Sequence, residues 1–123
     1  MTPHVCEDAE FVIESLTVHC GLNAAHSVAV IGPGADVTTA RFVENGNFVY
    51  GLESEEDRWR ALHRRFGDRR GFVAVHASAD DTALPPASVD FVVAPPAVFS
   101  PQVEQEWRRI LRDGGRIVLL GRT

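Results

Sequence analysis

Hydrophobic residues follow two alternating patterns along the chain. Short, continuous apolar runs predict five strands, at residues 27–31, 48–52, 72–76, 89–93 and 116–120. In other segments apolar residues recur every three or four positions, which predicts helices at residues 7–20, 36 to 44 or 45, 55–66 and 100–111. Strands that are apolar throughout and alternate with helices are typical of a parallel sheet covered on both faces. The pattern therefore predicts an α/β fold, a doubly wound parallel sheet of about five strands with an N-terminal helix.

The first strand ends in a glycine turn, within the segment VAVIGPGADV at residues 28–37. Gly32 and Gly34 remove side chains where a ligand would approach the backbone, and Asp36 is placed to cap the helix that follows. Glu53 stands about twenty residues further on, after the second strand, where an acid can accept both hydroxyls of a ribose. The pattern indicates a nucleotide or nucleoside site, and the alternative is a glycine turn that serves chain geometry alone.

A dinucleotide site fits this turn less well. Such a site requires a third glycine for close packing of the helix, and the chain has Val37 at that position. The carboxylate of Asp36 would also repel a pyrophosphate at the helix start. An NAD site is therefore the weaker interpretation.

Size and charge limit the class of protein. The chain has 123 residues, enough for one domain, which we divide into an N-terminal helical segment (1–26) and a core (27–121). The formal net charge of −5 argues against a nucleic acid partner. Arginines flank His63 on one predicted helix, and we interpret them as a solvated helix face rather than an RNA-binding surface. No apolar run approaches the ~20 residues that cross a membrane, and two cysteines give no disulfide framework, so we expect a cytoplasmic protein.

Two clusters of residue types have ordinary explanations. His19, Cys20 and His26 have no recognised ligand spacing, so we predict no metal site. Trp59 and Trp107 fall on the apolar faces of their helices and are predicted to lie in the core.

Four segments occur in a characteristic order: VAVIGPGADV, VYGLESEEDRW, ASADDTALPPASVDFVV and EWRRILRDGGRIVLLG. Together they resemble the class I S-adenosylmethionine-dependent methyltransferases, especially the type 11 group that acts on small molecules. The resemblance covers residues 27–121. It implies a Rossmann-like sheet with strand order 3-2-1-4-5, S-adenosylmethionine as cofactor and methyl transfer to a small molecule.

The resemblance also implies roles for individual residues. The turn at Gly32, Pro33 and Gly34 would pass under the methionine part of the cofactor, and Glu53 would hold the ribose hydroxyls. Asp80 would meet the adenine amino group with help from the Asp81 backbone. Ala94 and Pro95 would face the sulfonium and the substrate. The full set of predicted cofactor-binding residues is Gly32, Pro33, Gly34, Asp36, Glu53, Ser54, Asp80, Asp81, Ala94 and Pro95. No residue is predicted as a general base, because the cofactor's methyl is already activated.

The chain departs from the family pattern at two positions near the turn. Val30 replaces the acid that usually helps hold the cofactor's amino group, and Asp36 replaces the third glycine. Asp36 either supplies the lost charge from a new direction or crowds the methionine part. The segment 94–97 also lacks the polar and aromatic residues that amine methyltransferases carry there. The alternative function is a non-catalytic homologue that acts as a binding or regulatory module or as a partner subunit.

The last predicted strand raises a question of pairing. The family fold continues beyond its fifth strand with an antiparallel hairpin, and the resemblance ends after that strand. Residues 117–120 are therefore expected to form an exposed apolar edge. We expect a second copy of the chain to cover it in a symmetric homodimer, or another partner subunit, with the N-terminal helix as the alternative cover.

Overall fold

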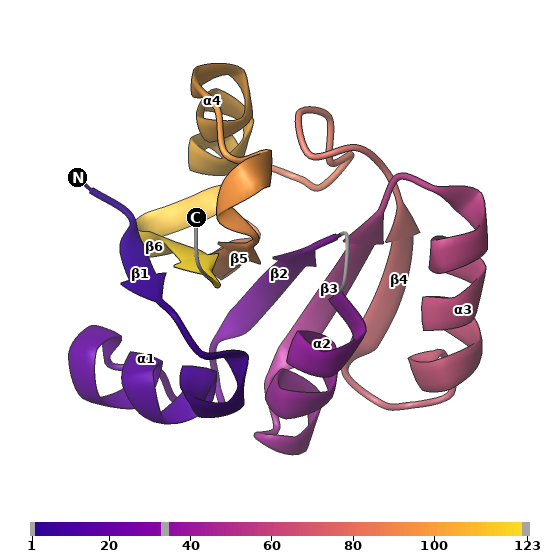
Figure 1. Cartoon of the computed structure of the whole chain (residues 1–123), viewed down its shortest axis with the longest axis horizontal. Coiled ribbons are helices and arrows are strands. Elements are labelled where there is room, and N and C mark those ends of the chain that lie inside the picture. Colours follow the sequence, from indigo (N-terminus) through magenta and orange to yellow (C-terminus); the bar gives the residue numbers. More distant parts are fainter. Residues whose placement is uncertain (1, 33–34, 122–123) are drawn as a thin grey trace.

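The computed structural model describes residues 2–32 and 35–121, which fold around one parallel sheet (Figure 1). Its strands, all parallel, stand in the order β1-β6-β5-β2-β3-β4. Their bounds are β1 His4–Cys6, β2 Ser27–Ile31, β3 Phe48–Glu53, β4 Phe72–His76, β5 Val89–Ala94 and β6 Leu111–Leu120. The predicted doubly wound α/β fold and its strand order, 3-2-1-4-5 in the family's numbering, are confirmed, and β1 is an additional strand.

Helices cover both faces of the sheet unequally (Figure 1). The longer helices are α1 Val12–Cys20, α2 Ala35–Glu44, α3 Glu56–Phe66 and α4 Pro101–Ile110. Two short 3-10 helices, η1 Ala9–Phe11 and η2 Pro96–Val98, precede α1 and α4. Side chains of α1, α2 and α3 share one hydrophobic cluster with the sheet, and side chains of α4 share the other with the loop of residues 77–88.

Each helix packs through the apolar stripe that the sequence shows. Phe42 of α2 and Leu16 of α1 are fully buried against one face of the sheet. Trp107 and Ile110 of α4 are fully buried against the other face, as predicted for Trp107. Trp59, also predicted to lie in the core, is only half-buried, and its ring stacks on His76 at the end of β4. No helix within the described residues is long and apolar enough to span a membrane.

The N-terminal segment differs from its prediction. The expected helix at 7–20 is shorter, because α1 begins only at Val12, after η1. Residues 4–6 form β1 and pair with β6, with His4 opposite Val118 and Cys6 opposite Leu120. Asp8 then accepts a hydrogen bond from the backbone N–H of Glu10 and caps η1. Cys6 therefore lies at the end of a strand, and the thiols of Cys6 and Cys20 are free.

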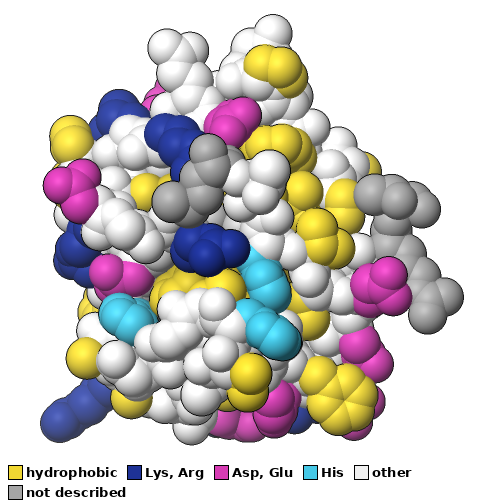
Figure 2. Space-filling model, turned by 90° about the vertical axis from the view of Figure 1, so that its left-hand side faces the viewer, with side chains coloured by type: hydrophobic (Ala, Val, Ile, Leu, Met, Phe, Trp, Pro, Cys, Tyr) yellow, Lys and Arg dark blue, Asp and Glu magenta, His cyan; other side chains and the backbone are white. Residues whose placement is uncertain are grey.

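The edge of β6, the fifth strand of the prediction, is not exposed. The expectation of a bare apolar edge at residues 117–120 is therefore wrong. β1 pairs with β6 along the segment that was expected to be bare, and Ile117 and Val118 are buried. Figure 2 shows the side of the molecule on which β1 and α1 lie, where histidine side chains gather beside an arginine. The rings of His4 and His19 are 5.8 Å apart there. The chain's own N-terminal strand, rather than its helix, covers this edge.

Parallel pairing brings the carboxyl ends of five strands, β2 to β6, to one edge of the sheet. Ile31 pairs with Leu52, and Glu53 pairs with His76, so β2, β3 and β4 end together. Ala94, the last residue of β5, pairs with Leu119 of β6. Ligands of open α/β sheets bind at this edge, beside the strand where the order reverses. β2 is that strand here.

Candidate functional site

The glycine turn begins where β2 ends. The N–H of Gly32 donates to the carbonyl of Leu52 at 2.8 Å, which extends the β2–β3 pairing by one residue. A Cβ at this position would collide with the carboxylate of Glu53, so glycine lets that carboxylate lie directly against the backbone here. The structure therefore brings two predicted site residues, Gly32 and Glu53, into direct contact. Pro33 and Gly34, also predicted, lie outside the described residues.

Glu53 is a buried carboxylate, and the arginine that it contacts is exposed. Its side chain is only 5% exposed, and its Oε2 lies 3.5 Å from Nε of Arg58, whose side chain is 54% exposed. Arg58 also approaches Glu55. Because Glu53 is buried, this is not a surface ion pair, and losing the arginine would remove compensation from a buried charge. Arg58 can therefore leave the carboxylate only when another hydrogen-bond donor takes its place.

A cavity of about 270 Å³ lies between α2 and α3 and is lined by Glu53, Asp36 and Arg58 with Ala61, Leu62 and Arg65; we call it the α2–α3 cavity. Asp36 does not cap α2, because the helix already begins at Ala35 and Asp36 stands in its first turn. Its Oδ2 lies 3.1 Å from Nη1 of Arg65. Asp36 therefore contacts α3 and lines the same cavity as Glu53.

A second cavity of about 280 Å³ opens at the ends of β2, β5 and β6; we call it the β2–β5 cavity. Ala94 and Pro95, both predicted, line it together with Val30 and Ile31. Its other lining residues are Glu7, Ala9, Thr38, Val93, Leu120 and Gly121. The first turn of α2 lies between this cavity and the α2–α3 cavity, since Asp36 lines one and Thr38 lines the other.

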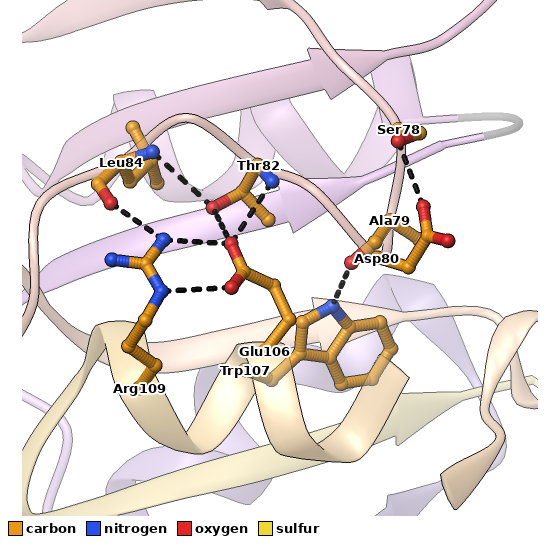
Figure 3. Close-up of polar contacts among 8 residues, drawn as sticks. All are labelled: Ser78, Ala79, Asp80, Thr82, Leu84, Glu106, Trp107 and Arg109. Carbon is orange, nitrogen blue, oxygen red and sulfur yellow. Dashed lines mark hydrogen bonds and ion pairs between the residues drawn. The ribbon is translucent and has the colours of Figure 1, made fainter. Parts of the chain in front are cut away.

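Asp80 and Asp81 are placed elsewhere. Both are exposed on the loop of residues 77–88, where the hydroxyl of Ser78 donates to Oδ1 of Asp80 at 2.8 Å (Figure 3). The backbone N–H of Asp81 donates to the carbonyl of Ser78, so it is already used. Asp80 lines a third hollow with side chains of α4, and it lines neither the α2–α3 cavity nor the β2–β5 cavity.

The same loop is fastened to α4 by polar contacts (Figure 3). The indole N–H of Trp107 donates to the carbonyl of Ala79 at 2.9 Å. Oε2 of Glu106 accepts from the backbone N–H of Thr82 at 3.0 Å and from its hydroxyl at 2.7 Å. Hydrogen bonds from Arg109, and secondarily from Thr82, lower the pKa of Glu106 to about 2 against the cost of burial. Glu106 thus stays ionised and holds the loop.

Ser54 lies beside a stack of rings that the sequence did not indicate. Its carbonyl oxygen is 3.1 Å from Nε2 of His76 at the end of β4. The Trp59 ring stacks on His76 at 5.3 Å and on His63 at 6.0 Å between centroids. These contacts join α3 to β4 and fix the segment next to Glu53.

Two polar side chains of the β2–β5 cavity, those of Thr38 and Glu7, were missed by the sequence interpretation. Thr38 is a buried polar residue of α2 that a helical pattern alone does not distinguish. Glu7 comes from the N-terminal segment, and only the pairing of β1 with β6 carries it to the strand ends. No spacing signal links Glu7 to the glycine turn, because the contact depends on sheet topology.

Solved structures with the same fold extend beyond this chain. An S-adenosylmethionine-dependent methyltransferase from Aquifex aeolicus superposes with a TM-score of 0.72 at 17% identity, covering 86% of this chain and 59% of its own. A protein from Methanococcus maripaludis, proposed to have the same activity, gives 0.76 at 17% identity, covering 90% and 54%. A geranyl diphosphate methyltransferase, solved in complex with S-adenosylmethionine, gives 0.73 at 18% identity, covering 91% and 47%. The chain thus spans about half the length of these proteins.

Sequence comparison identifies the family independently of the fold. No curated protein matches the sequence significantly. The family model for the methyltransferase domain matches residues 29–119, which include the glycine turn, Glu53, Ala94, Pro95 and the loop of residues 77–88. This chain therefore belongs to the methyltransferase domain family.

Proposed function

We propose that the domain binds S-adenosylmethionine and transfers its methyl group to a small molecule. The observation that carries the proposal is the buried carboxylate of Glu53 at the end of β3, packed directly on Gly32 at the end of β2. A fixed, desolvated carboxylate at this edge is suited to accept two hydrogen bonds from vicinal ribose hydroxyls. Arg58, which is exposed, would move aside.

The cavities fit the two ends of such a cofactor. Each is slightly smaller than the ~300 Å³ at which ligand pockets begin, and together they fall inside the usual range. The ribose would lie at Glu53, and the methionine part would pass the turn into the β2–β5 cavity beside Ala94 and Pro95. The predicted contact of Asp80 with adenine requires its carboxylate to turn away from Ser78.

The chain's own contribution to methyl transfer would be orientation. S-adenosylmethionine, when bound, supplies a methyl group already activated by its sulfonium. Ala94 and Pro95 form a largely apolar wall that would exclude water and leave an approach for the acceptor from the open side of the cavity. Holding an acceptor in line with the methyl accounts for much of the required rate enhancement without a general base.

A second candidate is a non-catalytic homologue that works as a binding or regulatory module or as a partner subunit. Two observations favour it. Val30 supplies no carboxylate at the position where relatives carry one, and Arg58 already neutralises Glu53. This candidate predicts a folded domain with no affinity for the cofactor.

Calorimetric titration with S-adenosylmethionine separates the two candidates. We expect binding by the wild-type chain and a loss of roughly 10-fold to 100-fold in Glu53→Gln, which keeps the shape but removes the charge. Glu56→Gln is the matched control, because Glu56 is exposed and forms an exposed ion pair with Arg60 on the same helix. If the wild type does not bind at millimolar cofactor, or if both variants bind like the wild type, the proposed site is wrong and the non-catalytic candidate is favoured.

A further inference from the structure

The β2–β5 cavity carries a charge that the family pattern does not supply. Among its lining residues Glu7, which is exposed, is the single ionisable side chain; Val30, Ile31, Ala94 and Leu120 supply apolar surface and Thr38 supplies a polar group. Within the described residues Glu7 forms no ion pair. A single carboxylate beside a cavity with no other charged side chain favours a cationic group over an anionic one.

The position of Glu7 is fixed by its neighbours on both sides. The carbonyl of Cys6 accepts a hydrogen bond from the N–H of Gly121 at 2.9 Å, which ties the chain to the end of β6. The Asp8 side chain accepts from the N–H of Glu10 at 2.9 Å and starts η1. The backbone of Glu7 therefore lies between two anchored residues, beside the end of β6.

Asp36 does not fill this role. Its carboxylate pairs with Arg65 and lines the α2–α3 cavity, so it neither supplies a charge to the β2–β5 cavity nor crowds it. Val30, which stands where an acid would be expected, lines the same cavity as Glu7. The one carboxylate among the lining residues of the β2–β5 cavity comes from Glu7, directly after the edge strand β1.

We propose that Glu7 binds the α-ammonium group at the amino-acid end of the cofactor. This inference rests on the proposed function, because it assigns one end of the same ligand. It makes β1 and the residue after it part of the ligand site, so that the N-terminal segment both covers the β6 edge and completes the cavity.

Two adenosine ligands test the assignment. S-adenosylhomocysteine carries the amino-acid end, and 5′-methylthioadenosine keeps the nucleoside but lacks that end. We expect Glu7→Gln to weaken S-adenosylhomocysteine roughly 5-fold to 20-fold and to leave 5′-methylthioadenosine unchanged in calorimetric titrations. Glu10→Gln is the control, since Glu10 is an exposed acid of the same segment and lines neither cavity.

The outcomes separate this inference from the proposed function. Equal affinity of the wild type and Glu7→Gln for S-adenosylhomocysteine overturns the role of Glu7 alone. Equal weakening of both ligands also overturns it, because it points to a general effect on the fold. If the wild type binds neither ligand, the cofactor site and the role of Glu7 are both wrong. Glu7→Asp, which keeps the charge, is expected to recover part of the lost affinity.

Discussion

Glu106 is the residue whose ionisation matters most for the loop over α4. It accepts two hydrogen bonds from Thr82 and is bonded by Arg109, and its pKa is lowered to about 2. A carboxylate with a lowered pKa stabilises the fold above its unfolded pKa, near 4.5, and that stability is lost as the pH falls toward 2. The loop's attachment is therefore electrostatic as well as apolar.

Glu106→Gln is expected to lower the free energy of unfolding by roughly 1–2 kcal/mol at pH 7. The value is kept small because the Arg109 side chain is 40% exposed and partly screened. Urea unfolding at pH 7 and at pH 3 measures it, and the variant should lose less stability between these pH values than the wild type. Glu56→Gln, which breaks the exposed pair with Arg60 on α3, should change stability by less than ~0.5 kcal/mol. An equal effect of both changes would contradict the special role of Glu106.

Residues of the site were predictable where the signal was local in sequence. Gly32 and Glu53 follow consecutive strands, so the spacing of glycine turn and acid was enough to place them together. Arg58 on Glu53 was not predictable, because an exposed helix arginine looks the same whether or not it reaches a strand end. The role of Asp80 stays a prediction: its motif position was clear, but Asp80 lines neither the α2–α3 cavity nor the β2–β5 cavity, and its carboxylate accepts from Ser78.

At the scale of elements, β1 depends on the protonation of His4. Burial lowers the pKa of His4, and the nearby positive charges of Arg116 and His19 lower it further. The unfolded chain therefore binds a proton more readily than the folded one, and stability falls as the pH drops below about 6.5. Nε2 of His4 lies 3.2 Å from the hydroxyl of Ser15, so the group that titrates lies where β1 meets α1.

His4→Gln removes this titration. We expect the wild type to lose stability between pH 7.5 and pH 5, and the variant to lose measurably less over the same interval. Chemical unfolding at the two pH values gives the difference, and His63→Gln on exposed α3 is the control. The same pH dependence in the wild type and in His4→Gln would show that other groups control the loss.

Element types followed from periodicity, but the N-terminal segment did not. The five predicted strands are all present because each is a continuous apolar run with a turn after it. β1 has only three residues, and their strand conformation is imposed by β6 rather than by their own pattern. The predicted helix at 7–20 consequently began too early, and the covered edge of β6 was missed for the same reason.

At the scale of the whole molecule, the outer edge is now β1 itself. Its central residue, Val5, is 58% exposed, and three residues make a short edge that offers little to another strand. A homodimer through the β6 edge stays a prediction, and it requires β1 to be released first. Intramolecular pairing by β1 and pairing with a second copy compete for the same backbone groups at Val118, Leu119 and Leu120.

This competition predicts how association depends on β1. Replacing residues 2–6 with a glycine–serine segment of equal length should bare the β6 edge and produce concentration-dependent association in sedimentation velocity. The wild-type chain should associate less at every concentration, because its edge is occupied from within. Val18→Ser is the control, since Val18 is an exposed apolar residue of α1 away from the pairing, and it should leave the association unchanged. If the chain without β1 sediments as the wild type does, the β6 edge is not an interface, and any partner of this domain must bind elsewhere.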